Sequence, residues 1–205
     1  YPRELVREVG RLGYLGCMIP PEYGGAGLDY LSYGIVCEEL AWADWVCAST
    51  VSIQNSLVGG SLVRWGTDAQ KRRFLVPLAR GEKIGAWSLT EPTAGSDASG
   101  TRSTAVRDGG DWVLNGSKTF ATHGSVCDVA VVFAVTDRGK GKHGISAFIL
   151  EAGMPGFRAG KKENKMGCRA SDTAEIVMAD CHVPDANRLG EEGRGFIDAL
   201  RILDG

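Results

Sequence analysis

Residues 112–120 read WVLNGSKTF, two short runs of strand-forming side chains on either side of Asn115-Gly116. Runs of this length and composition are typical of β-strands. An Asn-Gly pair between two such runs favours a two-residue turn, because both residues tolerate positive φ. The stretch therefore predicts a β-hairpin with its turn at Asn115-Gly116.

The residues that precede this stretch show helical periodicity instead. Apolar residues recur every three or four positions, and helices are predicted at about 29–43 and 49–65. In the first of these helices, four side chains are expected to face inward: Leu31, Ile35, Val36 and Leu40. A further helix is predicted to begin at residues 67–70, Thr-Asp-Ala-Gln, because these side chains can form a capping box.

Beyond Ile84 the period changes to that of strands, and a helical pattern returns only after Val183-Pro184. Helices and strands that occupy separate parts of a chain favour the α+β class over a parallel βαβ sheet. The prediction is an N-terminal all-α domain, an antiparallel β-barrel-like or sandwich domain, and the start of a truncated C-terminal helical domain. Their expected bounds are 1–83, 84–185 and 186–205.

The composition excludes several classes of protein. Among 205 residues, 43% are hydrophobic and the net charge is −2, which argues against intrinsic disorder. Lysine and arginine number 23 against 25 aspartates and glutamates, so no general basic field exists for nucleic acid or an anionic membrane. The longest uncharged stretch, 45–63, carries too many polar residues for a membrane span. We expect neither nucleic-acid binding nor membrane insertion.

The six cysteines are scattered, without a C-x-x-C pair or clustered histidines, and are expected to be free thiols. Cys181 and His182 are adjacent, but neighbours on a strand point to opposite faces. No metal site is predicted.

Residues 87–97, WSLTEPTAGSD, form the segment that most suggests ligand binding. The end of a strand runs into a turn with Pro92 and then into small residues. Thr90 offers a hydroxyl, and Ala94-Gly95-Ser96 would let backbone amides approach an anion closely. Taken alone, a loop of this kind is more often structural than functional.

This segment resembles the T-E-P-x-A-G-S-D loop of the acyl-CoA dehydrogenase family, and the similarity continues in order along nearly the whole chain. Further matching segments are Glu38–Ala41, Trp65–Thr67, Gly81–Ala86, Leu114–Lys118, Lys165–Thr173 and His182–Pro184. The resemblance implies FAD as the cofactor and an acyl-CoA as the substrate. The implied reaction is α,β-dehydrogenation to the 2,3-enoyl-CoA, with hydride transfer to flavin N5.

The resemblance also implies which residues meet the cofactor: Trp87, Leu89, Thr90, Gly95, Ser96, Phe120, Ala121 and Thr122. Leu89 and Thr90 would meet the pyrimidine edge of the flavin, and Gly95 and Ser96 the pyrophosphate. Thr122 would hydrogen-bond the flavin near N5.

Phe120 would pack against the flavin where the family usually has Trp, which removes an indole N–H donor. His123 stands where the family commonly has Asn, and is expected to face solvent, with a role in tuning the flavin as the alternative. Ser96 and Asp204 would lie on the substrate side.

The family's catalytic base would lie beyond Gly205, so no catalytic residue is expected in this chain. Arg169 and Asp172 are interpreted as an ion pair that stabilises a turn. The expected partners are an electron-transfer flavoprotein as electron acceptor and further copies of the protein, as a tetramer or dimer. The expected location is the bacterial cytoplasm or the mitochondrial matrix.

Alternatives stay open at this point. An acyl-CoA oxidase or a flavin monooxygenase could share the fold, and the chain reads as a piece of a longer protein that would be inactive by itself. The length or branching of the acyl group, and a decarboxylating glutaryl-CoA type of reaction, are not determined by these residues.

Overall fold

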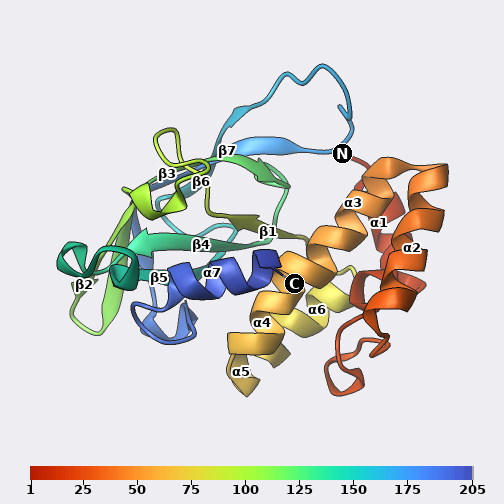
Figure 1. The fold of residues 1–205 in the computed structure, drawn as a ribbon, viewed down its shortest axis with the longest axis horizontal. Coiled ribbons are helices and arrows are strands. Elements are labelled where there is room, and N and C mark those ends of the chain that lie inside the picture. The colour runs from red at the N-terminus through yellow and green to blue at the C-terminus, as the bar shows by residue number, and fades with distance from the viewer. Residues whose placement is uncertain (205) are drawn as a thin grey trace.

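The computed structural model describes residues 1–204, with helices gathered at one side and strands at the other (Figure 1). The α- and π-helical elements are α1 (Arg3–Arg11), α2 (Tyr30–Ala43), α3 (Trp45–Ser52), a π-helical segment (Ile53–Gly59), α4 (Gly60–Trp65), α5 (Asp68–Gln70), a second π-helical segment (Lys71–Leu75), α6 (Val76–Ala79) and, after the strands, α7 (Gly195–Asp204).

The uncharged stretch that the sequence assigned to a helix is one continuous helical rod, from α3 through the first π-helical segment to α4. Val51, Val58 and Leu62 along it are fully buried. It ends at Trp65, where the predicted helix also ends. The predicted capping box is also present: Gln70 donates its backbone N–H to Thr67 Oγ1 at 3.2 Å, and Thr67 donates to Gln70 Oε1 at 3.0 Å.

Helix α2 departs from the prediction, because none of its residues is fully buried. Val36 and Leu40 pack partly against the core beneath α3, but Leu31 and Ile35 are 75% and 53% exposed. The helix is apolar on more than one face, and its main neighbour among the described elements is α3. One neighbour can cover only one face of a helix, so the outer apolar residues remain in contact with solvent.

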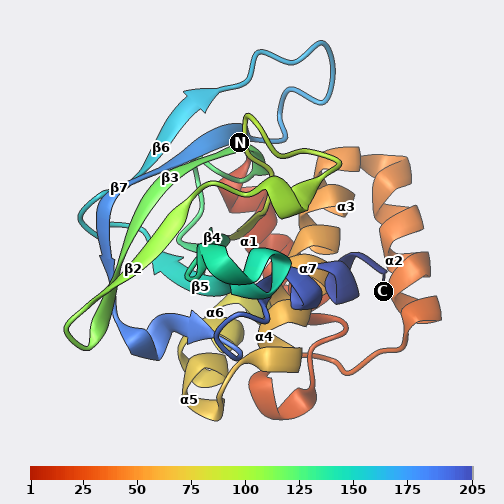
Figure 2. The ribbon, with the colours of Figure 1, turned by 60° about the vertical axis from the view of Figure 1, so that its left-hand side comes forward.

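The strands form one eight-stranded sheet in the order β6-β7-β3-β2-β4-β5-β8, with β1 pairing parallel to β4 (Figure 2). Their bounds are β1 (Gly85–Ser88), β2 (Thr104–Asp108), β3 (Asp111–Thr122), β4 (Val129–Val135), β5 (Ile145–Glu151), β6 (Phe157–Lys162), β7 (Thr173–Val183) and β8 (Arg188–Leu189). Most pairings are antiparallel, and the sheet is curved but not closed. The predicted α+β class is confirmed.

The predicted hairpin turn at Asn115-Gly116 is wrong. Strand β3 runs straight through these residues, and the turn lies at Gly109-Gly110, where Asp108 pairs with Asp111. Gly116 has φ +141°, and a Cβ there would come within 2.7 Å of the Ser103 Cα. The pairing with β7 also shifts register at this point. The extra residue of this bulge lies in β7, where Ala179 and Asp180 stand opposite Asn115, and Gly116 itself serves the close backbone approach to Ser103.

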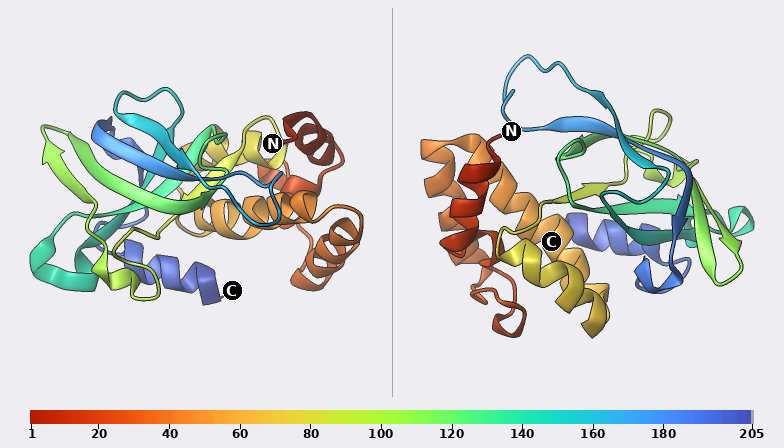
Figure 3. Two further views of the ribbon diagram at one scale, coloured as in Figure 1. Left: turned by 90° about the horizontal axis from the view of Figure 1, so that it is seen from above. Right: turned by 180° about the vertical axis from the view of Figure 1, so that it is seen from behind.

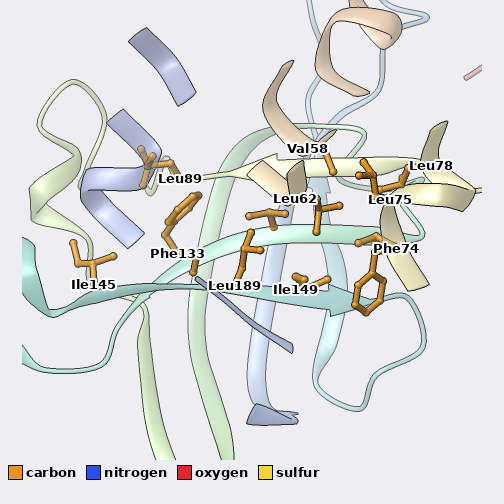
Figure 4. Packing of buried hydrophobic residues seen from close by; sticks show 14 of the residues in the cluster. Val58, Leu62, Phe74, Leu75, Leu78, Leu89, Phe133, Ile145, Ile149 and Leu189 are labelled. Atoms are coloured by element: carbon orange, nitrogen blue, oxygen red, sulfur yellow. The ribbon is translucent and has the colours of Figure 1, made fainter. Parts of the chain in front are cut away.

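Strand β4 is buried on both faces and joins two cores. Val131 and Phe133 face the helices, whereas Val132 and Ala134 face the inside of the curved sheet. Figure 4 shows the first of these cores, where helical residues such as Leu62 meet side chains of the sheet. The helices, the sheet and α7 thus share apolar contacts, and α7 lies at one side of the molecule, where it contacts both β5 and α4 (Figure 3).

All six cysteines are free in the described residues. Cys181 is buried and His182 exposed, as their alternation on β7 predicts. Among residues 1–204, no helix combines the length and the apolar character that a membrane crossing requires.

Candidate functional site

The loop that follows β1 contains a tight turn. Glu91 and Ala94 exchange two backbone hydrogen bonds, of 3.0 and 3.1 Å, across Pro92 and Thr93. Beyond the turn the chain is exposed, and a Cβ added at Gly95 would have no heavy atom within 4 Å. The backbone at Gly95 is therefore open to the approach of a ligand.

A buried ion pair holds this loop against β3. Lys118 Nζ lies 2.7 Å from Glu91 Oε1 and donates a second hydrogen bond to the Leu89 carbonyl oxygen at 3.3 Å, with none of the lysine side chain exposed to solvent. Glu91 also accepts the backbone N–H groups of Arg102 and Ser103, at 2.6 and 3.0 Å. The pair thus ties together three segments of the chain.

Electrostatics keep Glu91 ionised in this buried position. Burial raises its pKa, but the ammonium of Lys118 and the hydrogen bonds from Ser103 and Arg102 outweigh burial, so that the pKa lies below its ordinary value. The sequence analysis missed this pair. Alternation along β3 was a usable signal, since it places Lys118 on the same face as the buried Leu114, where a charge needs a partner.

The end of β3 is strained. Phe120 and His123 have φ values of +57° and +65°, a left-handed conformation that is unusual for residues other than glycine. The pairing with β7 is irregular between Lys118 and Ala121. The ring of Phe120 is 65% exposed, whereas Ala121 is buried. Strained backbone of this kind is concentrated at functional sites in proteins.

The loop after β1 lies beside the strained segment at the end of β3, residues 120–123, which is called the strained turn below. Thr119 donates its backbone N–H to the Thr90 carbonyl oxygen at 2.8 Å. The structure therefore brings Thr90 beside the segment of Phe120, Ala121 and Thr122. Sequence reasoning had joined the two segments only through the family resemblance.

Two candidates use their side chains to hold the site in place. The indole N–H of Trp87 donates to Ser61 Oγ at 3.2 Å, and its ring packs edge-on against Phe133. The side chain of Leu89 lies in the apolar core between helices and sheet. What Leu89 can offer a ligand is therefore its backbone.

Asp204 lies apart from these candidates. It is exposed in the last turn of α7, and no hydrogen bond among the described residues joins it to either segment. A surface cavity of about 550 Å³ also lies elsewhere, lined by residues such as Arg64, Arg188 and Asp198 and by none of the candidates.

The expectation that His123 faces solvent is wrong. Its side chain is buried, with 1% exposed, and its two ring nitrogens lie 3.0 Å from the Gly85 carbonyl oxygen and 3.3 Å from Thr50 Oγ1. Burial lowers the pKa of the imidazole, against smaller raising effects from the Gly85 carbonyl and Asp172. The positive φ turns the side chain inward, toward the helices.

The expected ion pair between Arg169 and Asp172 is also wrong. Asp172 is fully buried and accepts hydrogen bonds from Ser125 N and Oγ, at 2.9 and 2.6 Å, with Lys162 Nζ at 3.2 Å. Arg169 instead donates to the Lys165 carbonyl oxygen. The end of the loop turns the carboxylate inward, where the Ser125 turn provides donors, while Arg169 stays at the surface.

Comparisons with known proteins agree with this architecture. Residues 1–82 match the model of the acyl-CoA dehydrogenase N-terminal domain, and residues 86–181 match that of the acyl-CoA dehydrogenase middle domain. The chain belongs to the acyl-CoA dehydrogenase family.

Among curated relatives, the chain is 51% identical to the short-chain specific acyl-CoA dehydrogenase of Megasphaera elsdenii, over the whole chain and 55% of that protein. The solved butyryl-CoA dehydrogenase from the same organism superposes with a TM-score of 0.95 at 50% identity, covering the whole chain and 54% of that structure.

A structure described as the electron transferring flavoprotein of Acidaminococcus fermentans superposes with a TM-score of 0.97 at 51% identity, covering 99% of this chain and 53% of that one. The chain thus spans about half the length of the curated relatives that it matches.

Proposed function

We propose that this chain is part of an FAD-dependent acyl-CoA dehydrogenase, which converts an acyl-CoA thioester to the 2,3-enoyl-CoA. The observation that carries the proposal is the strained, exposed turn at Phe120, held beside Thr90 at the positions that match the family's flavin motifs. We place the functional units at residues 1–83, 84–185 and 186–205.

The residues present fit a flavin. Phe120 offers an exposed aromatic face that no core packing requires, and Gly95 offers open backbone for a phosphate. The hydroxyl of Thr119, inside the strained segment, is buried without a hydrogen-bond partner among the described residues. A family structure at 41% identity and a TM-score of 0.91, glutaryl-CoA dehydrogenase from Mycobacterium smegmatis, is described as a complex with FADH2.

In this proposal, Trp87, Leu89 and Thr90 place the loop at the pyrimidine edge, with Leu89 and Thr90 in contact through backbone and hydroxyl groups. Phe120 and Ala121 pack against the ring, and Thr122 donates a hydrogen bond near N5. Gly95 and Ser96 meet the pyrophosphate of the cofactor, and Ser96 and Asp204 meet the acyl-CoA. The bound flavin supplies the hydride-accepting chemistry, while the chain's own groups orient it and exclude water.

None of the chain's carboxylates is assigned as the base that removes the α-proton. Glu91 and Asp172 are both held in buried hydrogen-bond networks within the fold, which leaves neither free to reach a substrate.

We propose a short-chain acyl-CoA as the substrate, supported by the short-chain specific relatives of M. elsdenii at 51% identity and of the mouse at 44%. An electron-transfer flavoprotein is proposed as the acceptor, supported by the Acidaminococcus structure and by a relative at 45% identity, a subunit of the caffeyl-CoA reductase–Etf complex of Acetobacterium woodii. A homo-oligomer, in the bacterial cytoplasm or the mitochondrial matrix, completes the proposal.

The test uses the full-length protein that contains this chain, loaded with FAD and mixed anaerobically with acyl-CoAs from four to sixteen carbons and with glutaryl-CoA. We expect bleaching of the flavin absorbance, fastest with the four-carbon substrate. Absence of bleaching with every substrate would contradict the proposal. Oxygen consumption during turnover would instead indicate an oxidase, an activity represented among the structural neighbours by a prolyl acyl carrier protein oxidase at 32% identity.

A further inference from the structure

The ring of His123 joins three segments that are distant in the sequence. One nitrogen, Nδ1, lies 3.0 Å from the Gly85 carbonyl oxygen at the start of β1, and the other, Nε2, lies 3.3 Å from Thr50 Oγ1 in α3. The ring of Tyr1 packs edge-on against the imidazole, with 5.2 Å between ring centroids. The side chain therefore bridges the helical part and the sheet.

The directions of these hydrogen bonds follow from the chemistry of the partners. A carbonyl oxygen only accepts, so Nδ1 carries the hydrogen and Nε2 of the neutral ring is an acceptor. It faces the hydroxyl of Thr50, which can donate either to Nε2 or to the Val46 carbonyl oxygen at 2.9 Å. Nδ1 of the neutral imidazole is thus matched to a fixed acceptor, and Nε2 is matched when the Thr50 hydroxyl turns its hydrogen from Val46 to the ring.

The backbone of His123 is held as firmly as its ring. Its N–H donates to the Asp172 carbonyl oxygen at 3.0 Å, and its own carbonyl oxygen accepts from Val126 and Cys127 at 3.0 and 2.8 Å. These contacts hold the residue at a φ of +65°. The strained turn therefore ends at an anchored residue, one position after Thr122.

We propose that His123 is a positioning residue: through Gly85 and Thr50 it anchors the turn of residues 120–123 to β1 and α3, and so holds that turn in the shape that binds the cofactor. The inference rests on the proposed function for what the turn binds. It assigns His123 no contact with the cofactor itself.

Burial, and not the loss of a hydrogen bond, opposes protonation of the anchored ring. The titratable groups that face the imidazole are the phenol of Tyr1 and the carboxylate of Asp172, and the carboxylate is already engaged by Ser125 and Lys162. Burial consequently dominates and lowers the pKa of His123. When the ring is released into solvent, its pKa returns to the ordinary value of about 6.5. Release below that pH is therefore accompanied by the uptake of a proton.

The experiment compares the full-length protein with two variants, His123→Asn and His182→Asn. Asparagine tolerates the left-handed conformation and can donate to Gly85, but it does not titrate. His182 is exposed on β7, so its variant makes the same chemical change away from the anchor. The measured quantity is the Kd of FAD for the apoprotein, by flavin fluorescence, at pH 7.5 and pH 5.5.

We expect the wild type and His182→Asn to lose FAD affinity between the two pH values, by at most about tenfold, because pH 5.5 lies about one unit below the ordinary histidine pKa. The His123→Asn variant should bind more weakly at pH 7.5 and lack this loss. A His123→Asn variant that binds FAD as tightly as the wild type at both pH values overturns the inference.

A wild type that binds no FAD at either pH overturns the proposed function, and the anchor is then measured directly. An NMR titration of the imidazole protons, assigned with the same two variants, should show one histidine, His123, with a pKa below the ordinary value. Ordinary titration of His123 near pH 6.5 contradicts the inference whether or not FAD binds.

Discussion

The two ends of strand β3 differ in the regularity of their pairing and in the burial of their side chains. Up to Lys118 the strand is regular except at Gly116, and it buries Trp112, Leu114 and Lys118 in the interior of the sheet. From Thr119 onward the pairing becomes irregular, the backbone enters the left-handed region at Phe120, and an aromatic ring is exposed. One strand thus supplies stability at one end and strain at the other, which is the usual cost of a pre-shaped site.

The largest effect is expected at Lys118, where the two ends meet. Replacing it by Met should lower the free energy of unfolding by about 3–5 kcal/mol, because Glu91 is left as an unpaired buried charge. Chemical denaturation of the full-length protein at pH 7.5 measures the loss. The loop that carries Thr90 should also loosen, with a rise in its amide hydrogen exchange.

Two further variants control this result. Lys161→Met changes an exposed lysine of β6 and should alter stability by less than about 0.5 kcal/mol. The double variant Glu91→Gln/Lys118→Met removes both charges and should recover part of the loss.

Since the pKa of Glu91 is held below its ordinary value, the pair stabilises the fold above a pH of about 4.3, and this contribution disappears as the pH falls through the folded-state pKa. If the unfolding free energy of Lys118→Met equals that of the wild type, the ion pair between Lys118 and Glu91 does not stabilise the fold.

A smaller loss is expected at Gly116, in the regular end of the strand. Alanine there must adopt a φ of +141° and meets the backbone of Ser103, so Gly116→Ala should cost about 2–4 kcal/mol. Gly110→Ala is the matched control, since a Cβ at Gly110 has no heavy atom within 4 Å. If both variants melt at the same temperature, the close approach of Ser103 does not exist in solution.

The smallest change in stability is expected in the strained end. Phe120→Gly relieves the left-handed conformation and removes little buried surface, so the unfolding free energy should stay within about 1 kcal/mol of the wild type or rise. The affinity for FAD should nevertheless fall about tenfold or more, since the aromatic face is lost. A marked loss of stability without a loss of FAD affinity would show that Phe120 belongs to the core instead.

Local patterns predicted local structure well. The capping box at Thr67 and the helical rod through Val58 follow from interactions between residues a few positions apart, and both are present. The burial of α2 was not predictable in the same way. Leu31 and Ile35 are as apolar as the residues of α3, but burial depends on which other elements pack against a helix, and pattern alone does not supply that.

In the candidate site, too, some residues were indicated by short motifs and others were placed only by the fold. The family resemblance named Thr90 and Phe120 from short motifs, and the structure places their segments side by side. The family resemblance did not indicate that Lys118 forms a buried ion pair or that His123 is buried. Their partners, Glu91 and Thr50, are 27 and 73 positions away in the chain.

The sequence by itself determined the α+β class and the family, because these depend on local periodicity and on short segments of defined composition. The tertiary structure alone decided that Asn115-Gly116 lies within a strand and not in a turn, that Lys118 and His123 are buried, and that the end of β3 is strained. The physical reason is that burial, ion pairing and backbone strain depend on groups that only folding brings together.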